Sequence, residues 1–299
     1  GDIRGCFDNF AHQWMLDNIP LDQRILNQFL KAGYIYDGIL YRNKSGTPQG
    51  GLISPLLANM ALDGMERMLK EHFPGNKVHL IRFADDFLVT ADSQETALQC
   101  KELIAEFLHE RGLELSEEKT KVVHINEGFD FLGWNFRKFK GKFLIQPSKK
   151  AIAAIIDKVR VIIKSAKAWK QEDLIKALNP VIKGWAMYHR TASASMTFGK
   201  LDWVVRNMLW RWAKRRHNNK GKRWIARKYW HPTLTRKQVF RTSTLTLENF
   251  SNTKIQYRKF IKLDANPFID TEYFENRPGV FLSKQRSIRM FLHCAHKSG

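Results

Sequence analysis

The chain has 299 residues, which is enough for two or three domains, each with a core of its own. It contains no run of 18 or more apolar residues, so no membrane span is predicted. The three cysteines (Cys6, Cys100 and Cys294) are scattered and lack CxxC spacing, which argues against a disulfide framework or a zinc site.

Charge divides the sequence into two unlike parts. Residues 1–130 contain 13 Lys and Arg against 20 Asp and Glu, a net charge of −7, whereas residues 131–299 contain 37 against 9, a net charge of +28. A basic segment of this size releases counterions when it meets a phosphate backbone, so nucleic acid is the predicted partner. An anionic membrane surface is the alternative, but no basic amphipathic helix flanked by lipid anchors supports it.

The first ten residues are expected to be the end of a strand that enters a helix. Asp2 is placed on the strand, and Phe7 follows it five residues later. Phe7 is suited either to lie beneath the sugar of a nucleotide or to pack in the core, and the sequence leaves both open. Helices are expected over residues 11–18 and 21–32.

Glycine and proline mark residues 46–51 as a loop. Gln49 lies within reach of a ligand there, and Gly50 lets backbone approach closely; a simple turn is the alternative. Ser54 is expected to cap a helix with Pro55 in its first turn. Its inner face is predicted from apolar residues at helical spacing: Leu56, Leu57, Met60, Ala61, Met65, Met68 and Leu69.

Two β-favouring runs flank Asp85 and Asp86, which predicts a hairpin with both acids at its tight turn. Adjacent carboxylates repel each other, so one interpretation is a bound divalent metal. The other is a solvated turn, where Asp is common because it hydrogen-bonds locally. Taken alone, the hairpin favours the solvated turn.

A further helix should begin at Asp92 or Ser93 and stop at Gly112. Lys119 follows in a polar segment, where it is either a substrate contact or a solvated side chain beside two glutamates. Strands are predicted at Val122–Ile125, Phe129–Phe136 and Phe143–Ile145.

Composition changes at Pro147–Ser148, and a helical, basic region follows. Three helices are expected, over about 149–164, 172–185 and 201–217. In the third, Arg206, Trp210 and Lys214 share a face, and basic residues interleaved with an aromatic suit contact with nucleic acid. A dense basic cluster is predicted to bind phosphate: Lys214, Arg215, Arg216, Lys220, Lys222 and Arg223.

Three ordered blocks now stand together: Asp2 with Phe7, the stretch from Gly46 to Asn59, and the Phe83-Ala84-Asp85-Asp86 hairpin. They resemble the palm motifs of reverse transcriptases, most closely those encoded by group II introns. The resemblance implies an α+β fold, in which an antiparallel palm sheet packed on helices (residues 1–147, without the fingers) precedes an all-α thumb or maturase domain X (148–235). Residues 236–299 would be a linker or a truncated DNA-binding or endonuclease remnant.

The resemblance also implies a chemistry, RNA-directed DNA synthesis by two-metal nucleotidyl transfer. Two Mg²⁺ ions would be held by Asp2 and Asp85 with support from Asp86, and Phe7 would sense the 2′-hydroxyl of a nucleotide. Gln49, Gly50 and Lys119 would contact the dNTP. The Phe131-Leu132-Gly133-Trp134 stretch resembles a primer grip, with Leu132 and Gly133 at its centre. Phe83 replaces the tyrosine that is commonest in the family.

The helical region resembles a maturase domain in Gly184–Arg190, Leu209–His217 and Trp224–Trp230. Intron RNA and an RNA template with a DNA primer are the implied partners, with no membrane. His293, Cys294 and His296 lack paired cysteines, so no zinc and no endonuclease are expected. The implied compartment is the bacterial cytoplasm, near the nucleoid, or an organelle.

The sequence opens one residue before Asp2, so we expect it to be part of a longer protein. Without the fingers the chain is expected to polymerise poorly unless a separate N-terminal piece joins it. The alternative function is a non-catalytic maturase that binds intron RNA.

Overall fold

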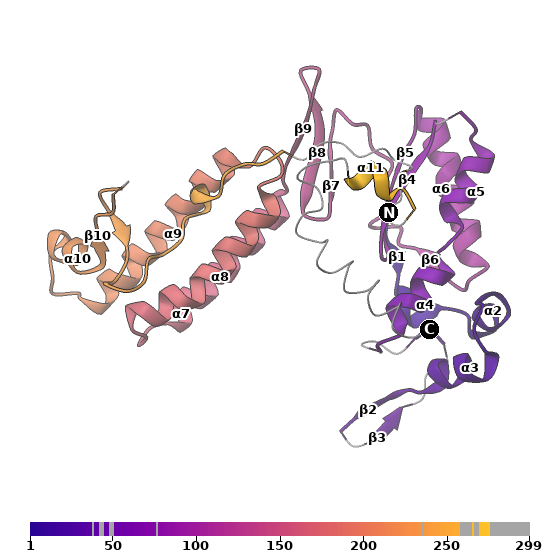
Figure 1. The fold of residues 1–299 in the computed structure, drawn as a ribbon, viewed down its shortest axis with the longest axis horizontal. Coiled ribbons are helices and arrows are strands. Elements are labelled where there is room, and N and C mark those ends of the chain that lie inside the picture. The colour runs from indigo at the N-terminus through magenta and orange to yellow at the C-terminus, as the bar shows by residue number, and fades with distance from the viewer. Residues whose placement is uncertain are drawn as a thin grey trace. The chain divides into compact units, whose positions relative to one another are not determined.

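The computed structural model describes residues 1–37, 39–41, 45–47, 51–75, 77–234, 236–257, 265 and 269–275, with no side-chain description for 34–36, 39–41 and 275. The chain forms two compact units, residues 1–128 and 129–299 (Figure 1). Helices mix with small antiparallel sheets, which confirms the predicted α+β class. Within the described residues no helix has both the length and the apolar character needed to cross a bilayer.

In the first unit, β1 (Ile3–Arg4) leads into α1 (Cys6–Asn9), as predicted. β1 pairs antiparallel with β6 (Glu114–Leu115). Just before β1, the carbonyl oxygen of Gly1 accepts a hydrogen bond of 3.0 Å from the amide of Phe87. The backbone around Asp2 is therefore joined on one side to β6 and on the other to the strand that follows Asp85.

That strand belongs to the predicted acidic hairpin. β4 (His79–Phe83) pairs with β5 (Asp86–Thr90), and the register sets Phe83 opposite Asp86. Only Ala84 and Asp85 are left to form the turn, so Asp85 lies at its tip as predicted, whereas Asp86 is the first residue of β5 and pairs with Phe83.

Five further helices cover this unit: α2 (His12–Asn18), α3 (Gln23–Lys31), α4 (Ser54–Ala61), α5 (Met65–His72) and α6 (Gln94–His109). α3 begins where the Asp22 carboxylate accepts the amides of Arg24 and Ile25. α6 begins where Ser93 accepts the amide of Thr96, one of the two caps expected. A short hairpin of β2 (Tyr34–Tyr36) and β3 (Ile39–Tyr41) follows α3.

Three expectations for this unit are wrong. Ser54 is the first helical residue and not the cap, because Ile53 occupies the cap position. The long apolar stripe is divided between α4 and α5 because Gly64, at φ +90°, interrupts the helix; Leu56 is 55% exposed. Residues 122–125 form no strand, since Val122 and Val123 are exposed and no neighbouring strand pairs with them.

The second unit opens with a three-stranded antiparallel sheet in the order β7-β8-β9 (Phe129–Phe131, Trp134–Phe139 and Lys142–Pro147). β9 confirms the strand predicted over 143–145, but the single strand predicted over 129–136 is divided into β7 and β8 by a turn at Leu132 and Gly133. The unit boundary at residue 128 precedes the change in composition at Pro147. The three-domain division remains a prediction.

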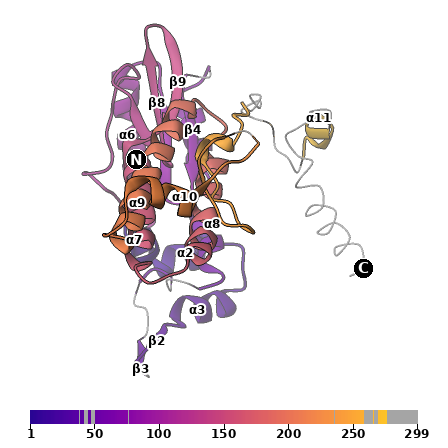
Figure 2. The same ribbon diagram turned by 90° about the vertical axis from the view of Figure 1, so that its left-hand side faces the viewer.

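The predicted helices follow as α7 (Lys149–Ser165), α8 (Gln171–His189) and α9 (Ser195–Arg216), then α10 (Lys222–Tyr229). α7 lies alongside both α8 and α9 in the two views (Figures 1 and 2). The core between them is aliphatic and aromatic, for example Val159, Leu178, Leu201, Leu209 and Trp212. Such continuous burial is the main stabilising contribution to a helical unit.

The chain then returns along these helices through β10 (Trp230–His231), β11 (Val239–Phe240) and η1 (Phe250–Asn252). Phe240, Leu247 and Phe250 are buried in the same core as α8 and α9. A last short helix, α11, spans Thr271–Glu275. His293, Cys294 and His296 lie outside the described residues.

Candidate active site

The acidic pocket of the first unit, lined by Asp2, Phe7, Asp85, Ser116 and Lys119 among others, brings most of the predicted site together. Asp2 comes from the start of β1, Asp85 from the hairpin turn and Lys119 from the turn after β6. These segments are distant in sequence but are held side by side by the backbone pairing around Asp2. The hairpin acids therefore face a third acid, which a solvated turn alone does not explain.

The three carboxylates repel one another. The pKa of Asp86 is raised from its ordinary value, first by burial and then by the negative charges of Asp85 and Asp2. The buried thiol of Cys6, in the same pocket, has its pKa raised to about 12, mainly by burial and next by Asp85. The pocket is thus a site of negative potential that favours a bound cation.

Lys119 supplies one positive charge. Its Nζ atom lies 2.9 Å from Oδ2 of Asp2, whose side chain is only 16% exposed. This hydrogen bond, and then the charge of Asp2, raise the pKa of Lys119. The lysine therefore points at the acids, but its side chain is 67% exposed, so its contact with a substrate stays a prediction.

Two residues that sequence reasoning missed hold the hairpin turn. One Nη atom of Arg82 donates to Oδ1 of Asn59 in α4 at 2.9 Å and to the Ala84 carbonyl at 3.1 Å. Ala84 has φ +55°, a conformation unusual for any residue other than glycine. The arginine bond offsets part of that strain and fixes the direction of Asp85. A lone arginine on a strand gives no sequence signal for this role.

The loop before the predicted Gln49 and Gly50 is fastened to the segment that carries Phe7. Thr47 donates its amide to the Phe7 carbonyl at 2.6 Å, and Gly46 donates to Phe10 at 2.9 Å. Gly46 has φ +70°, and a Cβ there would lie 2.2 Å from the Phe7 oxygen. Gln49 and Gly50 themselves lie outside the described residues. Phe7 packs on the core of this unit and also lines the pocket, so the core interpretation is confirmed and the contact with a nucleotide sugar stays a prediction.

Magnesium prefers carboxylate oxygens, and Asp2 with Asp85 supplies them on one pocket wall. Across the described ranges, no group of three His, Cys, Asp or Glu side chains converges as a metal cluster. One oxygen of Asp2 is engaged by Lys119. Asp2 and Asp85 thus supply donors of the type that Mg²⁺ prefers, but together with Asp86 they do not form a three-ligand cluster.

The proposed primer-grip pair forms the two-residue turn between β7 and β8. Leu132 and Gly133 have φ of +48° and +80°, as in the tight turns that fit a twisted hairpin. The Tyr188 hydroxyl donates to the Leu132 carbonyl at 2.7 Å, and the Ser148 amide donates to the Gly133 carbonyl at 2.9 Å. Helix α8 and the start of α7 thus position this turn; Tyr188 is half exposed and acts here through its hydroxyl.

The predicted basic cluster lies at the end of α9 and the start of α10. All six of its members are exposed: Lys214, Arg215, Arg216, Lys220, Lys222 and Arg223. Arg216 is held by a 2.6 Å bond to the Lys167 carbonyl and lies over Trp212. The others offer charge at a surface, as phosphate contact requires.

Two predicted members of this surface have partners within the unit. Trp210 is half-buried and packs on Trp230, with ring centroids 5.2 Å apart. Arg206 is exposed and donates to Gln238 at 2.6 Å, and its contact with RNA stays a prediction. Trp224 takes the place of Trp210 as the exposed ring, with the Nζ atoms of Lys220 and Lys228 at 5.6 and 5.0 Å from its centre.

Comparison with protein families assigns both halves of the chain. Residues 1–136 match the family described as reverse transcriptase (RNA-dependent DNA polymerase). Residues 152–230 match the group II intron, maturase-specific domain. The two matches occur in the order in which the resemblance placed them.

Individual curated proteins are also similar to part of this chain. The group II intron-encoded protein LtrA of Lactococcus lactis subsp. cremoris is 28% identical over 46% of this chain and 34% of its own length. Protein YkfC of Escherichia coli (strain K12) is 26% identical over 48% of this chain and 47% of its own. An uncharacterized 91 kDa protein in the cob intron of Schizosaccharomyces pombe is 26% identical over 47% of this chain and 25% of its own length. The chain thus spans between a quarter and a half of the length of each of these relatives. By its two domain matches it belongs to the group II intron-encoded reverse transcriptase and maturase family.

Proposed function

We propose that this chain supplies the polymerising centre and the RNA-binding domain of an RNA-directed DNA polymerase of group II intron type. The observation that carries the proposal is the shared pocket of Asp2 and Asp85, with Lys119 and Phe7 on its walls. Its substrates would be an RNA template with a DNA primer and a dNTP.

In this proposal Asp2 and Asp85, with support from Asp86, would be the residues that hold two Mg²⁺ ions. Such ions, when bound, activate a primer 3′-hydroxyl and stabilise the charge on leaving pyrophosphate. The chain's own residues do the positioning. Arg82 and Asn59 fix the turn that presents Asp85, and Phe7 lies where a nucleotide sugar would enter.

Lys119 has two tasks in this mechanism. It neutralises part of the acidic pocket through Asp2, and its protonated amine can donate to a triphosphate oxygen as the bond to pyrophosphate breaks. On the second unit, the Leu132–Gly133 turn would hold the primer strand. The basic cluster would hold intron RNA and the template–primer duplex through their phosphates.

The test is primer extension on an RNA template, with the chain alone and with a separate fingers segment added. Asp85→Asn is expected to reduce extension at least a hundredfold while the RNA dissociation constant stays within about twofold. The exposed Asp63 gives a matched control, because Asp63→Asn removes the same charge outside the pocket.

Extension by Asp85→Asn at the wild-type rate would remove the polymerase proposal. A second measurement tests metal binding independently of catalysis. Electron paramagnetic resonance measures the affinity for Mn²⁺, which should be weaker in Asp2→Asn and unchanged in Asp63→Asn. Splicing of intron RNA by the Asp85→Asn chain would then show the maturase function on its own.

A further inference from the structure

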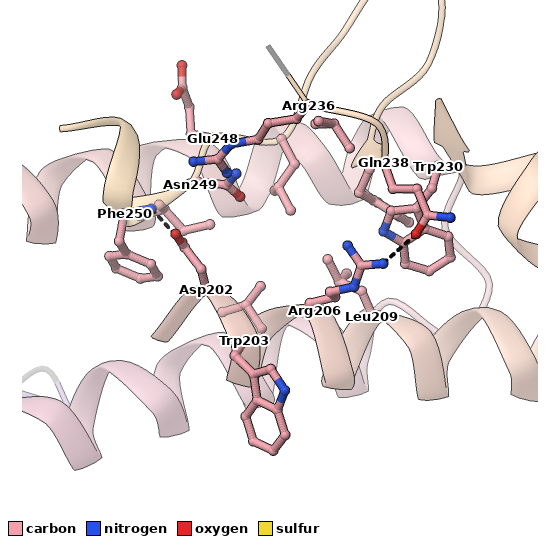
Figure 3. Close-up of a pocket in the computed structure, with 15 residues that line it drawn as sticks. Asp202, Trp203, Arg206, Leu209, Trp230, Arg236, Gln238, Glu248, Asn249 and Phe250 are labelled. Carbon is pink, nitrogen blue, oxygen red and sulfur yellow. Dashed lines mark hydrogen bonds between the residues drawn. The ribbon is translucent and has the colours of Figure 1, made fainter. Parts of the chain in front are cut away.

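A second pocket lies wholly within the second unit, between α9 and the returning segment that includes β11 and η1 (Figure 3). Residues 236–250 form one of its sides, and they lie outside both family matches. Neither the polymerase chemistry nor the basic cluster uses this pocket. Its rim residues are Asp202, Trp203, Arg206, Arg236, Gln238 and Glu248.

The floor of the pocket is apolar and rigid. Leu209, Phe240 and Phe250 line it, and all three are buried in the core of the unit. Trp230 completes this floor and is itself packed between Trp210 and Phe240 at 5.2 Å from each ring. A flat, uncharged ring would gain contact area here without displacing any core side chain.

The rim is polar and its charges are balanced. Asp202 is already committed, since its carboxylate accepts the Phe250 amide at 2.7 Å and the Ser251 amide at 3.2 Å. Glu248 adds a second negative charge, and Arg206 and Arg236 add two positive ones. A lone phosphate or a metal ion gains little from such a balance, whereas a neutral ring with donors and acceptors on its edge suits it.

Hydrogen-bonding groups for such an edge are on the rim. Arg206 and Gln238 face each other at the pocket, where the guanidinium donates to the amide oxygen at 2.6 Å (Figure 3). The Gln238 amide nitrogen remains to donate to the edge of such a ring. Arg236, held by a 3.1 Å bond to the Ser251 hydroxyl, presents a guanidinium plane on which a base can stack.

We propose that this pocket binds one unpaired base of the RNA, flipped out of its strand. The inference rests on the proposed RNA-binding function and adds a site that reads single-stranded RNA to it. Trp203, 66% exposed and one turn before Arg206 on α9, points away from the Arg206–Gln238 pair and would stack the neighbouring base.

The experiment compares two RNA hairpins that differ at one bulged position, which is a normal nucleotide in one and an abasic nucleotide in the other. Both carry the same phosphates, so electrostatic attraction is equal. The wild-type chain is expected to bind the intact hairpin about tenfold more tightly, the effect of one stacked and hydrogen-bonded base. Gln238→Ala should reduce this ratio to near one.

Lys237→Ala is the matched control, because Lys237 is the exposed neighbour of Gln238 and does not line the pocket. It should weaken binding of both hairpins alike and leave their ratio at the wild-type value. Equal wild-type affinity for the two hairpins would overturn the pocket assignment while leaving RNA binding intact. Failure to bind either hairpin would instead contradict the proposed function. If Gln238→Ala unfolds at a lower temperature than the wild-type chain, Gln238→Glu, which keeps the side chain's size, must still reduce the ratio of the two hairpin affinities to near one.

Discussion

The pKa of Asp86 shows how the carboxylates of the acidic pocket affect the stability of the folded chain. Its raised pKa means that the ionised carboxylate is disfavoured in the folded chain, so the stability that this group contributes is fully present below the ordinary pKa of 3.8 and is lost as pH rises through the raised value. We therefore expect Asp86→Asn to raise the melting temperature at pH 7 by roughly 1–3 °C when no divalent ion is added.

The gain should shrink as pH falls through the raised pKa, where wild-type Asp86 takes up its proton. Scanning fluorimetry with and without MgCl₂ measures both effects. Added Mg²⁺ should stabilise the wild-type chain more than the variant, because the ion relieves the same repulsion. An unchanged or lower melting temperature for Asp86→Asn, with Asp63→Asn as the surface control, would contradict this account of the pocket.

Gly46 is a second residue whose role is physical and testable. Its positive φ and the 2.2 Å approach of an added Cβ to the Phe7 oxygen exclude any side chain. Gly46→Ala should therefore lower the free energy of unfolding by about 2–4 kcal/mol and detach the loop from Phe7. Gly75 has a similar φ of +88° but open space around it.

Gly75→Ala should consequently lower the free energy of unfolding only by the cost of placing alanine at a positive φ, about 1 kcal/mol. Urea denaturation of the two variants separates the clash from the backbone penalty. Equal losses would show that contact with Phe7 is not what requires glycine at residue 46.

At the scale of elements, local signals determined what could be predicted. Ser93 and Ser148 are side-chain caps at the starts of α6 and α7, and periodic apolar residues follow them. The strand predicted at 122–125 does not form, because its β-favouring residues have no partner strand. The sequence of a single segment does not reveal whether a partner is available. Trp210 shared the predicted face with Arg206, yet its partner Trp230 is 20 positions away.

The candidate site shows the same limit. The hairpin turn was predictable from Asp85 and its flanking strands, whereas the grouping of Asp2 with Asp85 came only from a family resemblance, and the contact between Asp2 and Lys119, 117 positions apart, was not predicted. Asn59 lies at the end of a matched stretch that gave it no role, and nothing in the sequence paired it with Arg82. Long-range side-chain contacts depend on packing, which a single sequence does not display.

The β7–β8 turn gives a prediction at this scale. Leu132 adopts a left-handed conformation that asparagine accepts more readily, so Leu132→Asn should stabilise the chain by about 0.5–1 kcal/mol. If the leucine side chain contacts the primer, extension should nevertheless fall, and denaturation together with primer extension measures both quantities.

The β8–β9 turn is a matched control, because Lys140 and Gly141 have φ of +47° and +78°. Lys140→Asn installs the same turn sequence on the neighbouring hairpin. It should give a similar gain in stability with no change in extension. A fall in extension for both variants would remove the primer-grip assignment from Leu132.

For the whole molecule, the division of charge is the dominant property. We expect the negative potential to attract metal ions to one unit, and the net charge of +28 over residues 131–299 to attract nucleic acid to the other. If RNA were attracted by overall charge alone, every exposed lysine would contribute equally to RNA binding. The structure instead concentrates exposed charge beside the ring of Trp224, at the end of α9 and the start of α10.

Salt dependence tests whether that concentration matters. Replacing Lys214 and Arg215 by Gln should reduce the slope of log affinity against log salt by about 1.4–1.8, since each lost phosphate contact removes 0.7–0.9. Lys149 and Lys150, also exposed in the same unit, give the control pair. Their double substitution removes the same charge from the start of α7, so it should leave the slope nearly unchanged. Filter binding of intron RNA from 50 to 500 mM salt measures both slopes, and equal reductions would mean that RNA is held by overall charge and not by a defined surface.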